Sequence, residues 1–161
     1  MKKIAIILFL LSIFTAFASV GFAETYTHPT QNWSVWIPAG WQLETHPNDE
    51  IIATSPGGDF HLFSQVASNG SSIEGTIAAV LGESGMLSEF QLVKKEKIQF
   101  NGVPADISYG KAKFHGTDVN VTLGLLSPGN FNHILVLFGN PGAWSNYDGD
   151  ISQILESINK I

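Results

Sequence analysis

Five histidines are the side chains of this chain best suited to holding a metal ion, because the sequence contains no cysteine. Asp59 and His61 stand two residues apart in a strand-like segment, so both would project from one face of the strand. We take this pair as the candidate metal ligands. Zinc or copper needs three or four ligands at about 2 Å, and no local pair of histidines supplies two of them. Scattered histidines without a metal are the simpler interpretation. Two looser groupings lie elsewhere, His115 with Asp118 and His46 with Asp49 and Glu50.

Ser84 has surroundings that resemble the nucleophile elbow of a hydrolase. The run Gly82-Glu83-Ser84-Gly85 falls one residue short of the Gly-x-Ser-x-Gly pattern, and it stands at the end of a predicted helix. Helix-terminating glycines explain the run better. Among the fourteen acidic residues, no two are singled out as a catalytic pair. We therefore expect no catalytic residue and no cofactor.

The four tryptophans could form a platform for a sugar or a protein partner, since exposed aromatic side chains mark interfaces. Trp33 alternates with Val35 and Ile37, and Trp144 belongs to an apolar helical stripe, so we assign both to the core. Trp41 directly follows a turn and is the best candidate for an exposed, partner-binding side chain.

Residues 1–23 have the pattern of a secretory signal peptide. Lys2 and Lys3 precede an apolar run, and Gly21-Phe22-Ala23 places small residues at the −3 and −1 positions of a cleavage site after Ala23. No Lys or Arg follows the run directly, which is atypical of a membrane anchor. The pattern predicts a periplasmic or secreted protein with no stable membrane anchor after cleavage.

Charge and composition restrict the partners of residues 24–161, which we expect to form a single domain. Removing Lys2 and Lys3 from a net charge of −6 leaves −8, and the chain has no arginine. Nucleic acids and anionic membranes are bound mainly through clustered Lys and Arg, so we expect neither partner. Without cysteine, the fold has to be stabilised by its core rather than by disulfides.

Short alternating segments separated by turn residues follow from Trp33 onward, as is typical of an antiparallel sheet, here of about six strands. Asn101-Gly102 is the strongest hairpin signal in the chain. Lysines in the middle of 90–100 place that strand near a sheet edge. The segment 131–139 is apolar on both faces, which places it at the centre of the sheet.

Two segments have helical spacing. Ser71 and Glu74 have the spacing of a capping box at the start of a helix that ends near Gly82 and Gly85. From Trp144 to Ile158, apolar residues step by three or four and form one continuous stripe. Such a stripe has to be buried, so we expect the fold class α+β, with helices packed on a largely antiparallel sheet.

The run from Trp33 to Trp41, with its Pro38-Ala39-Gly40 turn, resembles the aromatic strand and Pro-x-Gly-Trp opening of the PsbP-like superfamily. The Asn101-Gly102-Val103-Pro104-Ala105 segment, the strands up to Gly139 and the C-terminal helix are similar to the rest of its layout. The superfamily includes the PsbP subunit of photosystem II, DcrB-type envelope proteins and the Mog-type Ran-binding protein. The resemblance implies an α/β/α sandwich used for binding or assembly rather than for catalysis.

The leader and this resemblance together predict an exported, non-enzymatic binding or accessory protein of the bacterial cell envelope. Its partner would be another envelope or secreted protein, which the sequence does not identify. A small periplasmic hydrolase, or a metal-binding protein using His61 and Asp59, is the alternative. A photosystem role is disfavoured because its basic surface does not fit a net charge of −8. A Ran-binding role is disfavoured because an exported chain does not reach the nucleus.

Overall fold

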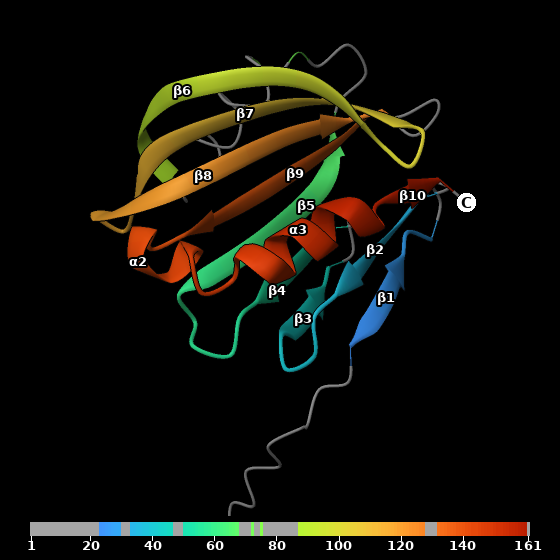
Figure 1. Ribbon diagram of the computed structural model, residues 1–161, viewed down its shortest axis with the longest axis horizontal. Coiled ribbons are helices and arrows are strands. Elements are labelled where there is room, and N and C mark those ends of the chain that lie inside the picture. The colour runs from blue at the N-terminus through green and yellow to red at the C-terminus, as the bar shows by residue number, and fades with distance from the viewer. Residues whose placement is uncertain are drawn as a thin grey trace, which may run out of the picture.

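The computed structural model describes residues 23–29, 33–46, 50–67, 72, 75, 87–127 and 132–160. These residues form two antiparallel sheets and two C-terminal helices, which confirms the predicted α+β class (Figure 1). The larger sheet has seven strands in the order β3-β4-β5-β9-β8-β7-β6. Their bounds are Gln42–Thr45 (β3), Ile51–Thr54 (β4), Phe60–Ala67 (β5), Leu87–Phe100 (β6), Val103–Phe114 (β7), Thr117–Leu126 (β8) and Asn132–Gly139 (β9).

Two tight turns join the three longest strands of this sheet. Asn101 and Gly102 have φ values of 47° and 86°, and His115 and Gly116 have 49° and 82°. Positive φ at both central residues is the type I′ geometry, whose twist matches that of antiparallel strands. The β6–β7 hairpin predicted from Asn101-Gly102 is confirmed, and β6 forms one edge of the sheet as its lysines predicted.

The large sheet has two buried faces because apolar side chains alternate along its strands. On the central strand β9, Leu135 and Leu137 enter a first core, which also contains side chains of β2 and the last helix. Ile134, Val136 and Phe138 enter a second core on the opposite face. The central position predicted for this strand is therefore confirmed.

A three-stranded sheet packs beside the large one, with β2 (Trp33–Ile37) between β1 (Glu24–Thr27) and β10 (Asn159–Lys160). The strand 33–37 was predicted, whereas its two neighbours were not. Most β1 residues are exposed, so that strand carries no alternating apolar signal. Its backbone pairs with β2 all the same, from Glu24 opposite Ile37 to Thr27 opposite Ser34.

The C-terminal segment forms two helices, and the single continuous helix predicted there is wrong. They are α2 (Pro141–Trp144) and α3 (Asp148–Ser157). Asn140 caps α2 by accepting a hydrogen bond from the Gly142 N–H at 3.0 Å, and Asp148 and Asp150 stand in the first turn of α3. In Figure 1, α3 runs across one face of the large sheet beside β2, and α2 lies next to β8.

Most of the other predicted helix, over 71–85, lies outside the described residues. Ser72 accepts a hydrogen bond from the Gly75 N–H at 3.1 Å, which is the spacing of an N-cap one residue after the expected Ser71. The predicted leader, apart from Ala23, also lies outside this part of the chain. None of the helices that the structure describes is long and apolar enough to cross a membrane.

Candidate partner-binding surface

Asp59 and His61, the predicted metal ligands, each have a hydrogen-bonding partner within the protein. Asp59 directly precedes β5, and its carboxylate accepts a hydrogen bond from the Ser55 hydroxyl at 3.0 Å. His61 lies on β5, with Nδ1 3.2 Å from the Thr54 hydroxyl oxygen on β4, and its ring stacks on Phe138. Partial burial lowers the pKa of His61, while a backbone hydrogen bond and the Asp59 charge act in the opposite direction.

Within the described residues, no group of three His, Cys, Asp or Glu side chains is placed to hold a metal ion. The ring of His115 packs on Phe114 at the β7–β8 turn, and His46 lies 3.9 Å from the Glu44 carboxylate. Asp49 and Ser84 lie outside the described residues. In this part of the chain, the structure therefore brings no third ligand to Asp59 and His61.

Trp41 is buried, and its expected exposure is wrong. Only 6% of the residue is accessible, because the turn after β2 directs the indole beneath α3 rather than into solvent. The ring packs edge-on against Phe60 and Tyr147, and its N–H donates to the Asp150 carboxylate at 3.3 Å. A side chain held in this way supports the fold and leaves little of its surface for a partner to contact.

A buried polar cluster joins the two sheets, and no pattern in the sequence predicted it. His133 of β9 and Ser64 of β5 are 1% and 0% exposed, and Ser64 Oγ lies 3.2 Å from His133 Nδ1. The His133 ring also packs edge-on against His28, which directly follows β1, and against Trp33, the first residue of β2. Burial, and secondly the neighbouring His28, lower the pKa of His133 to about 3. The imidazole is therefore neutral at physiological pH.

The serine and histidine of this cluster have the hydrogen bond of a nucleophile and its base. A nucleophile has to touch its substrate, however, and neither side chain reaches the surface. They also lie 69 residues apart in sequence, so no motif could have predicted their contact. The Ser64–His133 contact is therefore a core interaction between β5 and β9, and it occupies only one ring nitrogen, because the buried His133 Nε2 has no hydrogen-bond partner in the described part of the chain.

The β6–β7 hairpin (residues 87–114) is the basic surface of the chain, and we call it the basic hairpin. It carries five lysines and three acidic residues, a net charge of +2 in a chain whose net charge is −6. Two of the other lysines belong to the predicted leader. The hairpin's lysines are Lys94, Lys95 and Lys97 on β6, and Lys111 and Lys113 on β7. Counting lysines on both sides of Asn101-Gly102 would have revealed this concentration from the sequence.

Ion pairs and a tyrosine order one part of the basic hairpin. Glu96 accepts hydrogen bonds from the Lys94 ammonium and from the Tyr109 hydroxyl, each at 2.5 Å. The bond from Lys94, followed by that from Tyr109, lowers the pKa of Glu96. Burial and the bond to Glu96 raise the pKa of Tyr109 to about 12. The Lys94–Glu96 pair thus occupies the face of the hairpin that carries Tyr109.

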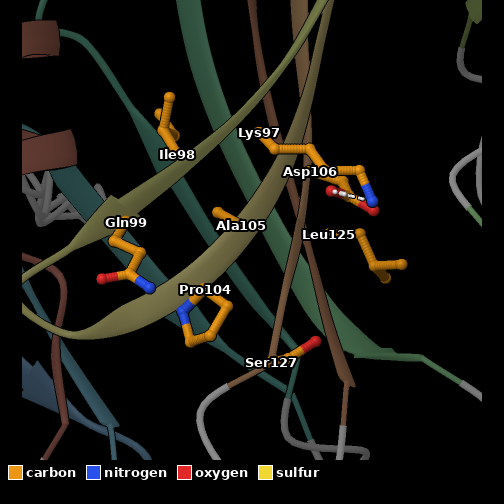
Figure 2. Close-up of a pocket in the computed structure, with 8 residues that line it drawn as sticks. All are labelled: Lys97, Ile98, Gln99, Pro104, Ala105, Asp106, Leu125 and Ser127. Atoms are coloured by element: carbon orange, nitrogen blue, oxygen red, sulfur yellow. Dashed lines mark ion pairs between the residues drawn. The ribbon is translucent and has the colours of Figure 1, made fainter.

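The other face of the basic hairpin borders an open groove of about 530 Å³ (Figure 2). Lys97 and Asp106 form an ion pair at 3.5 Å along its wall, as the dashed line in Figure 2 marks. Other lining side chains are polar or apolar, among them Gln99, Pro104, Leu125 and Ser127. The groove therefore offers one lysine–aspartate ion pair, amide and hydroxyl groups, and apolar surface within a few residues of the sheet edge.

Known proteins resemble this chain in structure and not in sequence. No family model matches the sequence, and no curated protein sequence matches it. The solution structure of cyanobacterial PsbP (CyanoP) from Synechocystis sp. PCC 6803 is similar, with a TM-score of 0.67 at 8% identity, over 91% of this chain and 96% of that one. The chain has a PsbP-like fold.

Two further solved structures support the PsbP-like fold. One is LpqN of Mycobacterium tuberculosis, involved in cell envelope biogenesis, with a TM-score of 0.54 at 14% identity over 85% of this chain and 89% of LpqN. The other is the Saccharomyces cerevisiae Ran-binding protein Mog1p, with a TM-score of 0.57 at 6% identity over 86% of this chain and 95% of Mog1p. The resemblance inferred from the Trp33 strand and the Asn101 hairpin is thereby confirmed for the fold.

Proposed function

We propose that this chain is exported and acts as a non-enzymatic binding or accessory protein of the bacterial cell envelope, with the basic hairpin contacting its partner. The observation that carries the proposal is that five lysines of an acidic chain gather on one hairpin, whose outer strand β6 is mostly exposed and forms a sheet edge. The signal-peptide pattern of residues 1–23 supports export, and the similarity in fold to an envelope-biogenesis protein fits this location. A second envelope or secreted protein is the partner we propose.

Charge segregation of this kind affects how a protein associates with its partners. A locally basic patch on an acidic protein orients an incoming acidic partner and repels the protein's own remaining surface. A catalytic role finds less support, because Asp59, His61, Ser64 and His133 are all engaged in contacts within the fold.

Export is tested with the full-length chain fused at its C-terminus to alkaline phosphatase without its own leader, expressed in a Gram-negative bacterium. We expect phosphatase activity, and mass spectrometry should find Glu24 as the first residue of the released protein. An inactive fusion that still begins with Met1 would contradict export.

Binding is tested by site-specific photo-crosslinking in the producing cells. A photoreactive side chain replaces Val93 on β6, which is 69% exposed, and in a matched variant it replaces Gln153, an exposed residue of α3. We expect one reproducible adduct from the Val93 position and none from the Gln153 position. Adducts at neither position, or turnover of ester, phosphate or glycoside substrates by the purified protein, would overturn the proposal.

A further inference from the structure

The outer edge of β6 has no paired strand among the described residues. β6 is the last strand of the seven-stranded order and pairs only with β7 among the described strands. Residues 91–95, together with Lys97 and Gln99, are exposed. In an antiparallel pair, alternate N–H and C=O groups point to the partner strand and the others point away. The outward groups of β6 are therefore available to a further strand.

Two irregularities define which part of this edge is straight enough to pair. The register with β7 shifts between Ser88 and Gln91, where Glu89 has a φ of 53°, and again between Leu92 and Lys94. From Lys94 to Phe100 the register is unbroken. β-Bulges end regular pairing and twist an edge away from other chains. An added strand would consequently pair with residues 94–100.

The charges on this segment favour an acidic strand over a second copy of the chain. Lys95 and Lys97 project from the face of the sheet that carries the groove, where Lys97 also pairs with Asp106, and Lys94 pairs with Glu96 on the other face. A symmetric antiparallel pairing of two β6 edges centred on Glu96 would bring Lys95 opposite Lys97 of the other copy, which is destabilising. Carboxylates in the same positions would instead face ammonium groups.

Apolar contacts are available at one end of the segment. Leu92 and Val93 are 49% and 69% exposed and are the large apolar side chains most exposed in the described part of the chain. At the other end, the groove extends inward over β7 and β8, where Pro104 and Leu125 lie beside Gln99 and Ser127 (Figure 2). A strand added along β6 would therefore meet apolar surface at its Leu92–Val93 end and lysines beyond it.

We infer that residues 94–100 of β6 bind an extended acidic segment of a partner protein as an additional strand. The main chain of that segment pairs with the β6 edge, and its carboxylates lie against Lys95 and Lys97. This inference rests on the proposed binding function and adds the mode of binding and the chemistry of the partner. Main-chain pairing contributes affinity, and the lysines select acidic sequences.

The test uses a fluorescein-labelled, end-blocked peptide of eight residues in which Glu alternates with Thr. Its control has Lys in place of Glu. Fluorescence anisotropy with residues 24–161 should show binding of the acidic peptide alone, weakening as salt is raised. Hydrogen exchange followed by NMR should show that alternate amides within 94–100 exchange about tenfold more slowly when this peptide is bound, because they become hydrogen-bonded.

Two variants locate the contact. Lys95→Glu and Lys111→Glu change the net charge equally, and both replace exposed lysines of the basic hairpin, but only Lys95 lies on the edge strand. We expect Lys95→Glu to weaken peptide binding at least about tenfold and Lys111→Glu to weaken it less than about threefold. Circular dichroism spectra of both variants should match that of the unsubstituted protein.

Failure to bind the acidic peptide would overturn the inference, as would binding without slower exchange in 94–100 or equal effects of the two variants. A concentration-dependent dimer with protected β6 amides, in sedimentation velocity and exchange measurements, would overturn it in favour of a second copy. A crosslinked partner at Val93 without peptide binding removes strand addition and leaves the proposed function intact. If neither a crosslinked partner at Val93 nor binding of the acidic peptide is observed, the proposed function and the strand-addition inference are both overturned.

Discussion

His133 is a titratable side chain enclosed by the fold, and its protonation state is linked to folding. Its imidazole contacts Ser64, His28 and Trp33, and it is 1% exposed. A protonated His133 ring would carry a charge cut off from water, and that charge would lie beside a second imidazole, that of His28. The pKa of about 3 in the folded protein therefore lies below the ordinary value of 6.5.

We predict that stability falls as pH is lowered from about 6.5 toward 3, because only the unfolded chain takes up the proton on His133 in this range. The pKa difference corresponds to a loss of about 2 kcal/mol between pH 7 and pH 5. Urea-unfolding midpoints across this range measure the effect. His133→Gln should flatten the pH dependence, whereas Ser64→Ala, which leaves the imidazole buried, should retain it. Equal slopes for His133→Gln and the unsubstituted protein would refute the linkage.

Gly110 is required by close packing where β6 bulges against β7. A Cβ at this position would stand 2.5 Å from the Phe90 ring and 2.7 Å from the Gln91 carbonyl oxygen. The ring thus covers the space over a glycine in the neighbouring strand, an arrangement that aids register. Because one of the two obstacles is backbone, a rotamer change alone cannot relieve the clash.

We predict that Gly110→Ala lowers the free energy of unfolding by about 1–3 kcal/mol, as measured by urea denaturation. Gly149 gives the matched control, since it lies in α3 with nothing within 4 Å of a built Cβ. Gly149→Ala should be neutral or stabilise by up to about 1 kcal/mol, because alanine favours the helix. If Gly110→Ala were as stable as Gly149→Ala, β6 and β7 would accommodate the added methyl group without loss of stability, which would contradict the prediction.

At the scale of elements, the edge strand β6 is protected against pairing with itself by its lysines and its two bulges. Lys95 and Lys97 lie on the unbulged segment, where another copy could otherwise pair. Lys111 and Lys113 of β7 do not lie at an edge, because β7 is flanked by β6 and β8. The lysines of the two strands consequently have different effects on self-association.

We predict that replacing Lys95 and Lys97 by valine produces concentration-dependent self-association, seen as a rising sedimentation coefficient over a range of protein concentrations. The control replaces Lys111 and Lys113 by valine, which removes the same charge from the inner strand. That variant should associate no more than the unsubstituted protein. If both variants associated equally, loss of net charge rather than exposure of the edge would be responsible.

The elements that the sequence predicted correctly have strong local signals. Asn101-Gly102 required a type I′ turn, and an apolar run on both faces placed β9 at the centre of the sheet. β1 and β3 were missed because they are short and mostly exposed. The apolar stripe of the C-terminal segment continues across residues 145–147, but the helical backbone does not. Asn140 caps a first helix that ends at Trp144, and a second helix begins at Asp148.

Contacts between distant residues explain why less of the candidate site could be predicted. The lysines of 94–97 suggested an edge strand, but the groove beside them also needs Leu125 and Ser127 of β8 and its following turn. Trp41 was expected at the surface because it follows a turn, and only the position of α3 with Asp150 buries it. The Ser64–His133 contact likewise depends on β5 pairing with β9.

At the scale of the whole molecule, the small and large sheets share no strand ladder among the described residues. The first core and α3 join them, with a few polar contacts at the rim. The Trp36 N–H of β2 donates to the Ser157 hydroxyl at the end of α3, at 2.8 Å. The Asn101 amide, at the tip of the basic hairpin, donates to the Glu156 carbonyl at 2.6 Å and to the Ile158 carbonyl at 3.4 Å. The two bonds from Asn101 satisfy carbonyls at the C-terminus of α3.

Asn101 therefore has two separable roles, and two substitutions separate them. Asn101→Gly keeps a residue that tolerates the φ of 47° but loses the amide, so we predict a loss of about 1 kcal/mol of stability. Asn101→Ala loses the amide and also strains the turn, for a total of about 2 kcal/mol. Urea denaturation measures both. If Asn101→Gly were as stable as the unsubstituted protein, the amide would contribute nothing to joining the hairpin and the helix. If the two variants lost equal stability, the turn would not depend on a residue that tolerates positive φ.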